Sequence, residues 1–304
     1  MIKRFIALIM TCSLLAVAAL PVATVSAQNK KDPIGSGLWS GANFDLSGKT
    51  ARKSSTSKPT MPDSRVYAAL GDSVAAGAGL PGQDTQCGRS NQAYPHEVAR
   101  KTGLTLAHIA CSGATAGDLV TKQGVSGPNL SPQLQTAFAN GTPRLITITA
   151  GANDAHWDDF LRKCYGMTCG TKSDDYIAKA YLTTLKAKLH IAFTDVQRRS
   201  NGTPPPVVVT GYYNPLSSKC IAPGQLTAAE ISWLNKEAAA LNKAIQDVSK
   251  RYKKFVKFVP VSFSGHDACS ADPWVQGLQD PAPFHPTAKG QSVIAQAVLR
   301  AVGY

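Results

Sequence analysis

The sequence predicts an α/β fold in which a central parallel sheet carries helices on both faces. From Arg65 onward, short apolar segments rich in β-branched residues alternate with longer segments of helical periodicity. Strands that alternate with helices of this length need crossover connections, and crossovers join parallel strands. Such sheets bind ligands at the carboxyl ends of their strands, so the residues that follow each strand are the candidates for a functional site.

The first expected elements run from residue 65 to residue 151. RVYAAL (65–70) is expected to be a strand that leads directly into the sequence GDS. NQAYPHEVARKTG (91–103) is expected to be a helix and LTLAHIAC (104–111) the next strand. A short helix over SPQLQTAFAN (131–140) then precedes RLITITAG (144–151), which we expect to be a buried strand.

A long amphipathic helix is expected over residues 174–199, followed by the β-branched strand PVVVTGYY (206–213). The next helix covers 227–252, and Thr227 and Glu230 at its start have the spacing of a capping box.

FVKFVPVS (255–262) is the last expected strand and PTAKGQSVIAQAVLRAV (286–302) the last helix. Pro286 suits the first position of that helix. Residues 64–304 are therefore expected to form a single domain without an internal repeat.

The N-terminus has the pattern of a secretory signal peptide. Lys3 and Arg4 precede an apolar run that ends at the small residues of Val25-Ser26-Ala27, so cleavage is expected after Ala27. A retained membrane anchor is the competing interpretation, because the run is nearly long enough to span a bilayer. Residues 28–63 are rich in Ser, Thr, Lys, Gly and Pro, and we expect a flexible basic arm or linker there.

Cysteine usage agrees with export. Of the seven cysteines, Cys12 lies inside the signal without a convincing lipidation motif, which leaves six. An even number in an exported chain predicts three disulfides. We expect the pairs to be Cys87–Cys111, Cys164–Cys169 and Cys220–Cys269. A metal site is the alternative, but no CxxC or HxxxH spacing supports it.

The net charge of +13 falls to +11 without the signal, with 30 basic and 19 acidic residues left. An exported protein this basic is expected to favour anionic surfaces, such as phospholipid headgroups or wall polymers. Nucleic acid is an unsuitable partner, because the basic residues are scattered and not interleaved with aromatic ones. We expect a monomer.

Four strand exits carry residues suited to acyl transfer. Ser73 in LGDSVAAGAG is surrounded by small residues that leave room for a carbonyl group, although a helix-capping serine is the plain alternative. Gly113 in CSGAT could point its N–H at a developing oxyanion, and Asn153 in GAND could add a side-chain donor. Asn153 could instead cap the next helix. His285 in FHPTAKG is placed to be a general base.

The sequences GDS, CSGAT, GAND and HPTAKG occur in the order and context of the four blocks of the SGNH (GDSL-type) hydrolase family. The chain resembles this family over residues 66–304, and most of all its secreted esterases and lipases with three disulfides. Val74 stands where the family name has leucine, a change that does not touch the chemistry.

The resemblance implies a three-layer flavodoxin-like fold and a serine ester hydrolase that needs no metal or organic cofactor. Ser73 would be the nucleophile and His285 the general base. The Ser73 N–H, the Gly113 N–H and the Asn153 side chain would form the oxyanion hole.

Other histidines are alternative candidates for the general base. His266 in SGHDAC, beside Asp267, is the second candidate. His96, His108, His156 and His190 are expected to be packing or surface residues, although His156 and Trp157, just after GAND, could instead line an acyl pocket.

Several groups are candidates for the partner of the His285 ring. Many family members have an aspartate three residues before the histidine, but Ala282 stands there. Asp280 reaches the ring only if the loop folds back. Pro283 suits the second position of a β-turn from Ala282 to His285, which would bring the Ala282 carbonyl to the ring. The remote carboxylates of Asp267 and Asp272 are the remaining candidates.

The substrate is not settled by these residues, because a fold does not determine it. We expect a lipid or phospholipid ester. Glycan O-acyl esterases or acyltransferases of the cell envelope are the alternative, followed by a non-catalytic wall- or lipid-binding protein.

Overall fold

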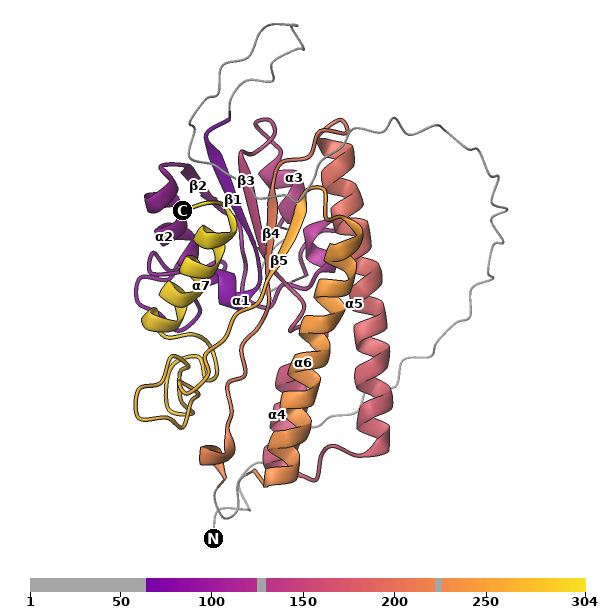
Figure 1. Cartoon of the computed structure of the whole chain (residues 1–304), viewed down its shortest axis with the longest axis vertical. Coiled ribbons are helices and arrows are strands. Elements are labelled where there is room, and N and C mark those ends of the chain that lie inside the picture. Colours follow the sequence, from indigo (N-terminus) through magenta and orange to yellow (C-terminus); the bar gives the residue numbers. More distant parts are fainter. Residues whose placement is uncertain (1–63, 125–129, 222–225) are drawn as a thin grey trace, which may run out of the picture. The chain divides into compact units, whose positions relative to one another are not determined.

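The computed structural model describes residues 64–124, 130–221 and 226–304, all within one compact unit (Figure 1). The expected signal (1–27) and arm (28–63) lie outside the described residues. Within the described ranges, no helix is both long and apolar enough to cross a bilayer.

The core of the fold is a five-stranded, fully parallel sheet. Its strands are β1 (Val66–Gly71), β2 (Thr105–His108), β3 (Leu145–Thr149), β4 (Val207–Thr210) and β5 (Val256–Val259). They lie in the order β2-β1-β3-β4-β5. This is the flavodoxin-like order, with a switch point between β1 and β3. The inner strands β3 and β4 are buried along their whole length, which explains their continuous apolar and β-branched sequences.

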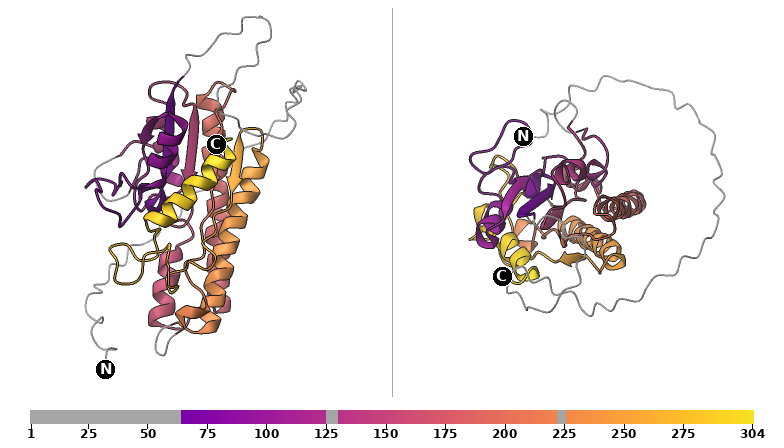
Figure 2. Two further views of the ribbon diagram at one scale, coloured as in Figure 1. Left: turned by 60° about the vertical axis from the view of Figure 1, so that its left-hand side comes forward. Right: turned by 90° about the horizontal axis from the view of Figure 1, so that it is seen from above.

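Helices cover both faces of this sheet and confirm the expected three layers. The helices are α1 (Ser73–Ala76), α2 (Tyr94–Thr102), α3 (Gln133–Ala137), α4 (Trp157–Gly166), α5 (Lys172–Arg199), α6 (Ala228–Arg251) and α7 (Ala288–Ala301). Figure 2 shows α2 and α7 side by side on one face, while α3, α5 and α6 cover the other.

The helix starts follow local capping rules. Thr227 caps α6 through the predicted box, in which Glu230 Oε2 accepts the Thr227 N–H at 2.8 Å. A second capping box, Thr171 with Asp174, begins α5 two residues before the expected start. Helix α7 begins later than expected. Thr287 is its cap, so Pro286 precedes the cap and does not occupy the first helical position.

Helices α5 and α6 extend well beyond the sheet. At 1.5 Å per residue, the 28 residues of α5 span about 42 Å, whereas strands of four to six residues span only about 13–20 Å. The overhang lies at the carboxyl end of the strands, where α4 packs against it (Figure 1). We call α4, the first turns of α5 and α6, and the 3₁₀ turn η2 (Ser218–Cys220) the helical lobe.

The helical lobe has an apolar cluster of its own, separate from the main core. Its buried members are Phe160, Leu161, Cys164, Cys169, Ala178, Leu216, Cys220, Leu226, Ile231, Trp233 and Leu234. Helix α4 was not expected from the sequence. It is short, and its buried side chains face this cluster, which only the overhang of the two long helices creates.

The three predicted disulfides are confirmed: Cys87–Cys111, Cys164–Cys169 and Cys220–Cys269. The first joins two loops near the carboxyl ends of β1 and β2. The second lies within the helical lobe, and the third joins the lobe to the segment after β5. Among the described residues, the one group of three potential metal ligands is Cys220, Asp267 and Cys269. Both of its cysteines are in a disulfide, so their sulfurs are not free thiolates.

Candidate active site

The chain leaves β1 at the switch point through a turn that requires glycine. Gly71 has φ +130°, and a Cβ there would lie 2.0 Å from the carbonyl oxygen of Thr149 on β3. The next residue, Asp72, caps α1, since its Oδ1 accepts the Val74 N–H at 2.9 Å. The cap is therefore Asp72 and not Ser73. Ser73 is the first residue of α1, and its hydroxyl is left for other partners.

Asp72 also connects the serine turn to two neighbouring strand exits. Its Oδ2 accepts the Tyr212 hydroxyl at 2.5 Å, and that hydroxyl accepts the Ala152 N–H at 3.2 Å. Asp72 is 1 % exposed, and burial raises its pKa to about 7, against the opposing effect of the Tyr212 hydrogen bond. The floor of the site is thus a buried polar network.

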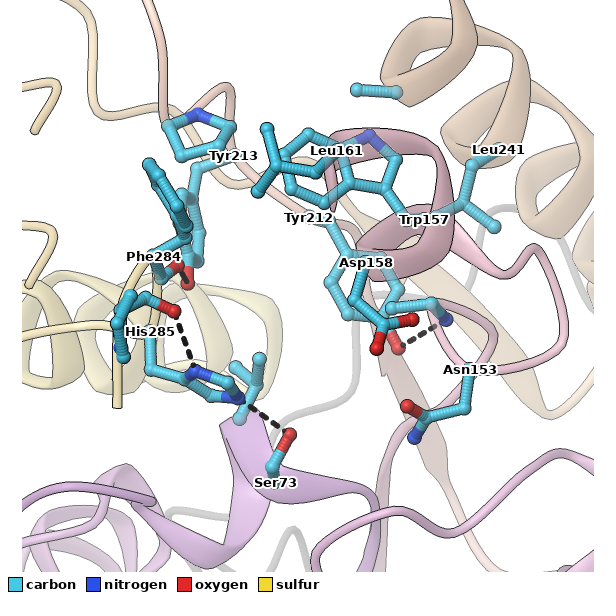
Figure 3. A pocket seen from close by; sticks show the side chains of 15 residues that line it. Ser73, Asn153, Trp157, Asp158, Leu161, Tyr212, Tyr213, Leu241, Phe284 and His285 are labelled. Atoms are coloured by element: carbon cyan, nitrogen blue, oxygen red, sulfur yellow. Dashed lines mark hydrogen bonds between the residues drawn. The ribbon is translucent and has the colours of Figure 1, made fainter. Parts of the chain in front are cut away.

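Ser73 and His285 meet directly, although 212 residues separate them in the sequence (Figure 3). The distance between Ser73 Oγ and His285 Nε2 is 2.7 Å. Burial lowers the pKa of His285, while the Pro283 carbonyl opposes the shift. The ring is therefore neutral at pH 7 and able to accept a proton at Nε2.

A backbone carbonyl, not a carboxylate, orients the histidine ring. The β-turn expected at Ala282 is present, with the His285 N–H donating to the Ala282 carbonyl at 3.2 Å. The ring Nδ1, however, lies 3.1 Å from the next carbonyl along, that of Pro283. The brace is therefore a main-chain carbonyl, as expected. The hydrogen bond from the ring is to Pro283, while the Ala282 carbonyl accepts the His285 N–H and also opposes the fall in the pKa of the ring.

The structure does not bring the candidate carboxylates to the ring. Asp280 is exposed, and its Oδ2 accepts the Gly277 N–H at 2.7 Å. Asp267 accepts the Cys269 N–H, and Asp272 pairs with Lys289 at 2.5 Å.

The second candidate base, His266, lies away from Ser73. It stacks on Trp274 with ring centroids 3.7 Å apart, and its Nδ1 is 2.8 Å from the Asp272 carbonyl.

Gln276 holds the histidine loop, and sequence reasoning missed it. Its side chain is buried; Nε2 donates to the Ala78 and Pro286 carbonyls at 2.9 and 3.2 Å, and Oε1 accepts the Ala282 N–H at 3.2 Å. Its backbone N–H donates to the His285 carbonyl at 2.7 Å. Gln276 therefore joins the histidine loop to the loop after Ser73. No local pattern marks a glutamine for this role.

The three expected oxyanion donors lie on adjoining loops. Within the described part of the chain, neither the Ser73 N–H nor the Gly113 N–H has an acceptor. Asn153 donates one amide hydrogen to the Ala114 carbonyl at 2.8 Å, which ties it to the Gly113 turn and leaves its second hydrogen available. Asn153 does not cap α4, because His156 occupies that position. Ser73, Asn153 and His285 line one cavity, and Gly113 is in the turn beside it.

Asp154, the last residue of GAND, links its own loop to the loop that contains Gly113. Its buried carboxylate accepts the Ala116 N–H at 2.7 Å and pairs with Lys188 of α5 at 2.7 Å. Asn153 and Asp154 therefore hold the Gly113 loop through two hydrogen bonds. The sequence did not indicate this role, because Lys188 is 34 residues away on a helix.

The cavity that Ser73 and His285 line has a volume of about 180 Å³ and is mainly apolar. Trp157, Leu161 and Leu241 lie across it from Ser73 and Asn153 (Figure 3). The other lining residues are Val74, Ala152, Asp158, Tyr212, Tyr213, Pro215, Ala238, Pro283 and Phe284.

Of the side chains that directly follow GAND, some line the cavity and others lie outside it. Trp157 lines the cavity, which was the alternative considered for it. His156 is a packing residue, as expected, and stacks on Tyr181 with ring centroids 4.2 Å apart. Asp158 is the acidic residue of the lining, and Arg162 pairs with it at 2.6 Å.

Comparison with known proteins identifies the family of the chain. The GDSL-like lipase/acylhydrolase family matches residues 69–293. The chain is 31 % identical to a lipase of Streptomyces rimosus, over 74 % of this chain and 82 % of the relative. The crystal structure of an extracellular lipase from the same organism covers 76 % of this chain and 99 % of its own, at 30 % identity and a TM-score of 0.62. A phospholipase A1 of Streptomyces albidoflavus covers 76 % and 98 %, at 26 % identity and a TM-score of 0.55. The chain therefore belongs to the GDSL-like lipase/acylhydrolase family of ester hydrolases.

Proposed function

We propose that the protein hydrolyses carboxylic esters of lipids through an acyl-enzyme on Ser73, with His285 as the general base. The observation that carries the proposal is the 2.7 Å contact between Ser73 Oγ and His285 Nε2 at an apolar cavity. A neutral imidazole within hydrogen-bond reach of a hydroxyl is what activation of a serine requires.

In the acylation step, Ser73 Oγ forms a bond to the ester carbonyl carbon while its proton moves to His285 Nε2. The carbonyl oxygen becomes an oxyanion, which the Ser73 N–H, the Gly113 N–H and the second amide hydrogen of Asn153 are placed to stabilise. When the tetrahedral intermediate collapses, the bond to the leaving alcohol breaks and His285 returns its proton to that alcohol.

In the deacylation step, water takes the place of the alcohol. Its oxygen bonds to the acyl carbon while His285 accepts its proton, and collapse releases the carboxylic acid and restores the Ser73 hydroxyl. Throughout, the Pro283 carbonyl accepts from Nδ1–H, which keeps Nε2 facing Ser73 and stabilises the positive charge that the ring gains.

The cavity lining supports a hydrocarbon acyl chain as the group bound there. Small apolar ligands bind in cavities of this kind, and a cavity of about 150 Å³ lined by aliphatic and aromatic residues holds benzene. A sugar ring would need more hydrogen-bonding partners than this mainly apolar lining offers. The relatives named lipase and phospholipase A1 support the same substrate class.

We also propose that the protein is exported, with residues 1–27 as the signal, 28–63 as an arm and 64–304 as the hydrolase domain. The three disulfides and the likeness to an extracellular lipase support export.

Covalent labelling by a fluorophosphonate probe tests the mechanism, since the probe phosphonylates an activated serine with loss of fluoride. We expect the parent protein and the surface control Ser232→Ala to be labelled, and Ser73→Ala and His285→Ala to lose labelling. Labelling that persists in Ser73→Ala would refute the assignment of the nucleophile.

Turnover of p-nitrophenyl esters of increasing chain length, with a phospholipid and an acetylated glycan beside them, tests the substrate class. A preference confined to acetyl groups would contradict a lipid substrate. Acyl transfer to an added alcohol in preference to water would make the protein an acyltransferase.

A further inference from the structure

The helical lobe exposes apolar side chains at the end of the molecule that carries the catalytic cavity. In the described ranges, the large hydrophobic residues with high exposure are Met167, Tyr176, Ile177, Ile191, Ile221, Leu278 and Tyr304. Four of these belong to the lobe or directly adjoin it: Met167 follows α4, Tyr176 and Ile177 lie in the first turns of α5, and Ile221 follows η2. Single exposed apolar residues are ordinary, but their concentration on one lobe is not.

The first turns of α5 carry a basic and aromatic stripe. Lys172, Tyr176 and Lys179 are spaced i, i+4 and i+7, so they project from the same side of the helix. All three are exposed, and Tyr176 is 78 % exposed. The buried residues Asp174 and Ala178 face the opposite direction, into the lobe.

Charge pairing in the lobe leaves these lysines unneutralised. The acidic residues nearby have basic partners: Arg162 pairs with Asp158 and Asp159, Lys163 with Asp174, and Lys236 with Asp175. Within the part of the chain that the structure describes, Lys172, Lys179 and Lys219 of η2 form no ion pair.

We propose that this surface, defined by Met167, Lys172, Tyr176 and Lys179, docks the protein onto bilayers that contain anionic phospholipid. Exposed lysines attract the phosphates of such a surface, and the amphipathic ring of a tyrosine suits the headgroup layer. Met167 supplies apolar contact with the acyl region beneath. The mixture of apolar and cationic side chains favours a lipid surface over a purely anionic polymer.

Docking by this surface has a direct consequence for the site. Helix α4, which belongs to the same lobe, contributes Trp157 and Leu161 to the cavity wall. Docking of the lobe would therefore place the cavity at the bilayer, where a lipid ester would be found. The inference rests on the proposed lipid substrate for its purpose, but vesicle binding can be measured without turnover.

The test uses Ser73→Ala protein, so that no lipid is hydrolysed, and vesicles of phosphatidylcholine with and without phosphatidylglycerol. Each lysine near an anionic membrane contributes about fivefold in affinity. Lys172→Gln with Lys179→Gln should weaken binding to anionic vesicles roughly 25-fold, with little effect on neutral ones. Met167→Ser with Tyr176→Ser should weaken binding to both.

Two matched controls distinguish binding through this surface from non-specific binding through exposed apolar or cationic residues elsewhere. Ile191→Ser removes a residue that is 54 % exposed on the same helix but outside the first turns, and should leave binding unchanged. Lys253→Gln with Lys254→Gln removes two exposed cations just beyond the C-terminus of α6, at the amino end of the sheet. That pair should also leave binding unchanged.

The proposal fails if the lobe variants bind as well as the parent, or if the Lys253 and Lys254 changes abolish binding. With Ser73 restored, the lobe variants should hydrolyse a water-soluble short-chain ester at the parental rate, which also shows that they are folded. If the parent binds vesicles through this surface but turns over no ester, docking stands and the proposed function fails.

Discussion

The two walls of the catalytic cavity are built by different means. The wall that holds Ser73 and Asn153 consists of strand exits, and hydrogen bonds tie its polar side chains to backbone groups of neighbouring loops. The facing wall, with Leu161 of α4 and Leu241 of α6, consists of helix side chains held by apolar packing. The interactions that hold the first wall are directional, whereas the apolar contacts that hold the second are not.

This difference separates chemistry from substrate choice. A buried hydrogen-bonded group cannot be replaced without leaving its partner unsatisfied, and misplacement of a reacting group is costly in rate. Apolar packing tolerates exchanges of similar volume at small cost. Substitutions in the first wall should therefore lower the rate for every ester, whereas substitutions in the second should change which esters are accepted.

Asn153→Ala should produce the largest effect among the supporting residues. It removes the side-chain donor that we propose for the oxyanion, so kcat should fall by about 10²–10³ for esters of every chain length. Steady-state kinetics across the ester series measures this, with Asn214→Ala as control. A loss confined to long chains would place Asn153 in the wrong wall.

Ala238→Leu should alter the apolar wall and leave the chemistry intact. Ala238 lines the cavity and is 3 % exposed, so the larger side chain shortens the space for the acyl chain. Selectivity should shift towards short esters by about 10–100-fold in kcat/KM, as expected for a few methylene groups. Ala239→Leu, at an exposed neighbouring position, is the control. Equal losses for acetyl and long-chain esters would contradict the separation of the two walls.

The pH dependence should show an acid limb from His285. The base must be neutral, and burial lowers its pKa, so the rate is maintained above that pKa and lost as the pH falls through it. The rate of fluorophosphonate labelling should fall about tenfold per pH unit below a midpoint that lies under 6.5. A midpoint above 6.5 would indicate that a carboxylate, not the Pro283 carbonyl, holds the ring.

Lys188→Met should weaken the hydrogen bonding in the wall that holds Ser73 and Asn153, although Lys188 does not line the cavity. Asp154 would lose its partner and its hold on the Gly113 loop, so kcat should fall about tenfold while KM changes little. Lys188→Arg should restore most of the rate, and Lys186→Met should have no effect. A reduced melting temperature with unchanged kcat would mean that the ion pair serves stability alone.

Asp280→Asn should have the smallest effect. A triad carboxylate would be worth about 10⁴ in turnover. Because Asp280 closes only the Gly277 turn, we expect a change of less than about threefold, a level at which loop effects of this kind are ordinary. Loss of more than a hundredfold would restore Asp280 as the partner of His285.

The sequence by itself determined the features that depend on local periodicity, capping and order along the chain. The strands and most helices, the Thr227 capping box and the parallel sheet follow from the spacing of apolar and β-branched residues. Ser73, Asn153 and His285 could be selected because a parallel sheet places its strand exits at one edge. The even count of six cysteines after the expected signal predicted three disulfides, and the expected pairs are confirmed.

Only the tertiary structure decided what joins these elements across space. Helix α4 exists because two long helices overhang the sheet and offer it a packing surface. Gln276, which reaches Ala78 across 198 residues, leaves no local signature. The partner of the His285 ring is the Pro283 carbonyl and not Asp280, and this depends on the path of the loop backbone, in which Phe284 takes φ +65°. Torsions and long-range contacts are set by the whole fold, so residue spacing alone cannot determine them.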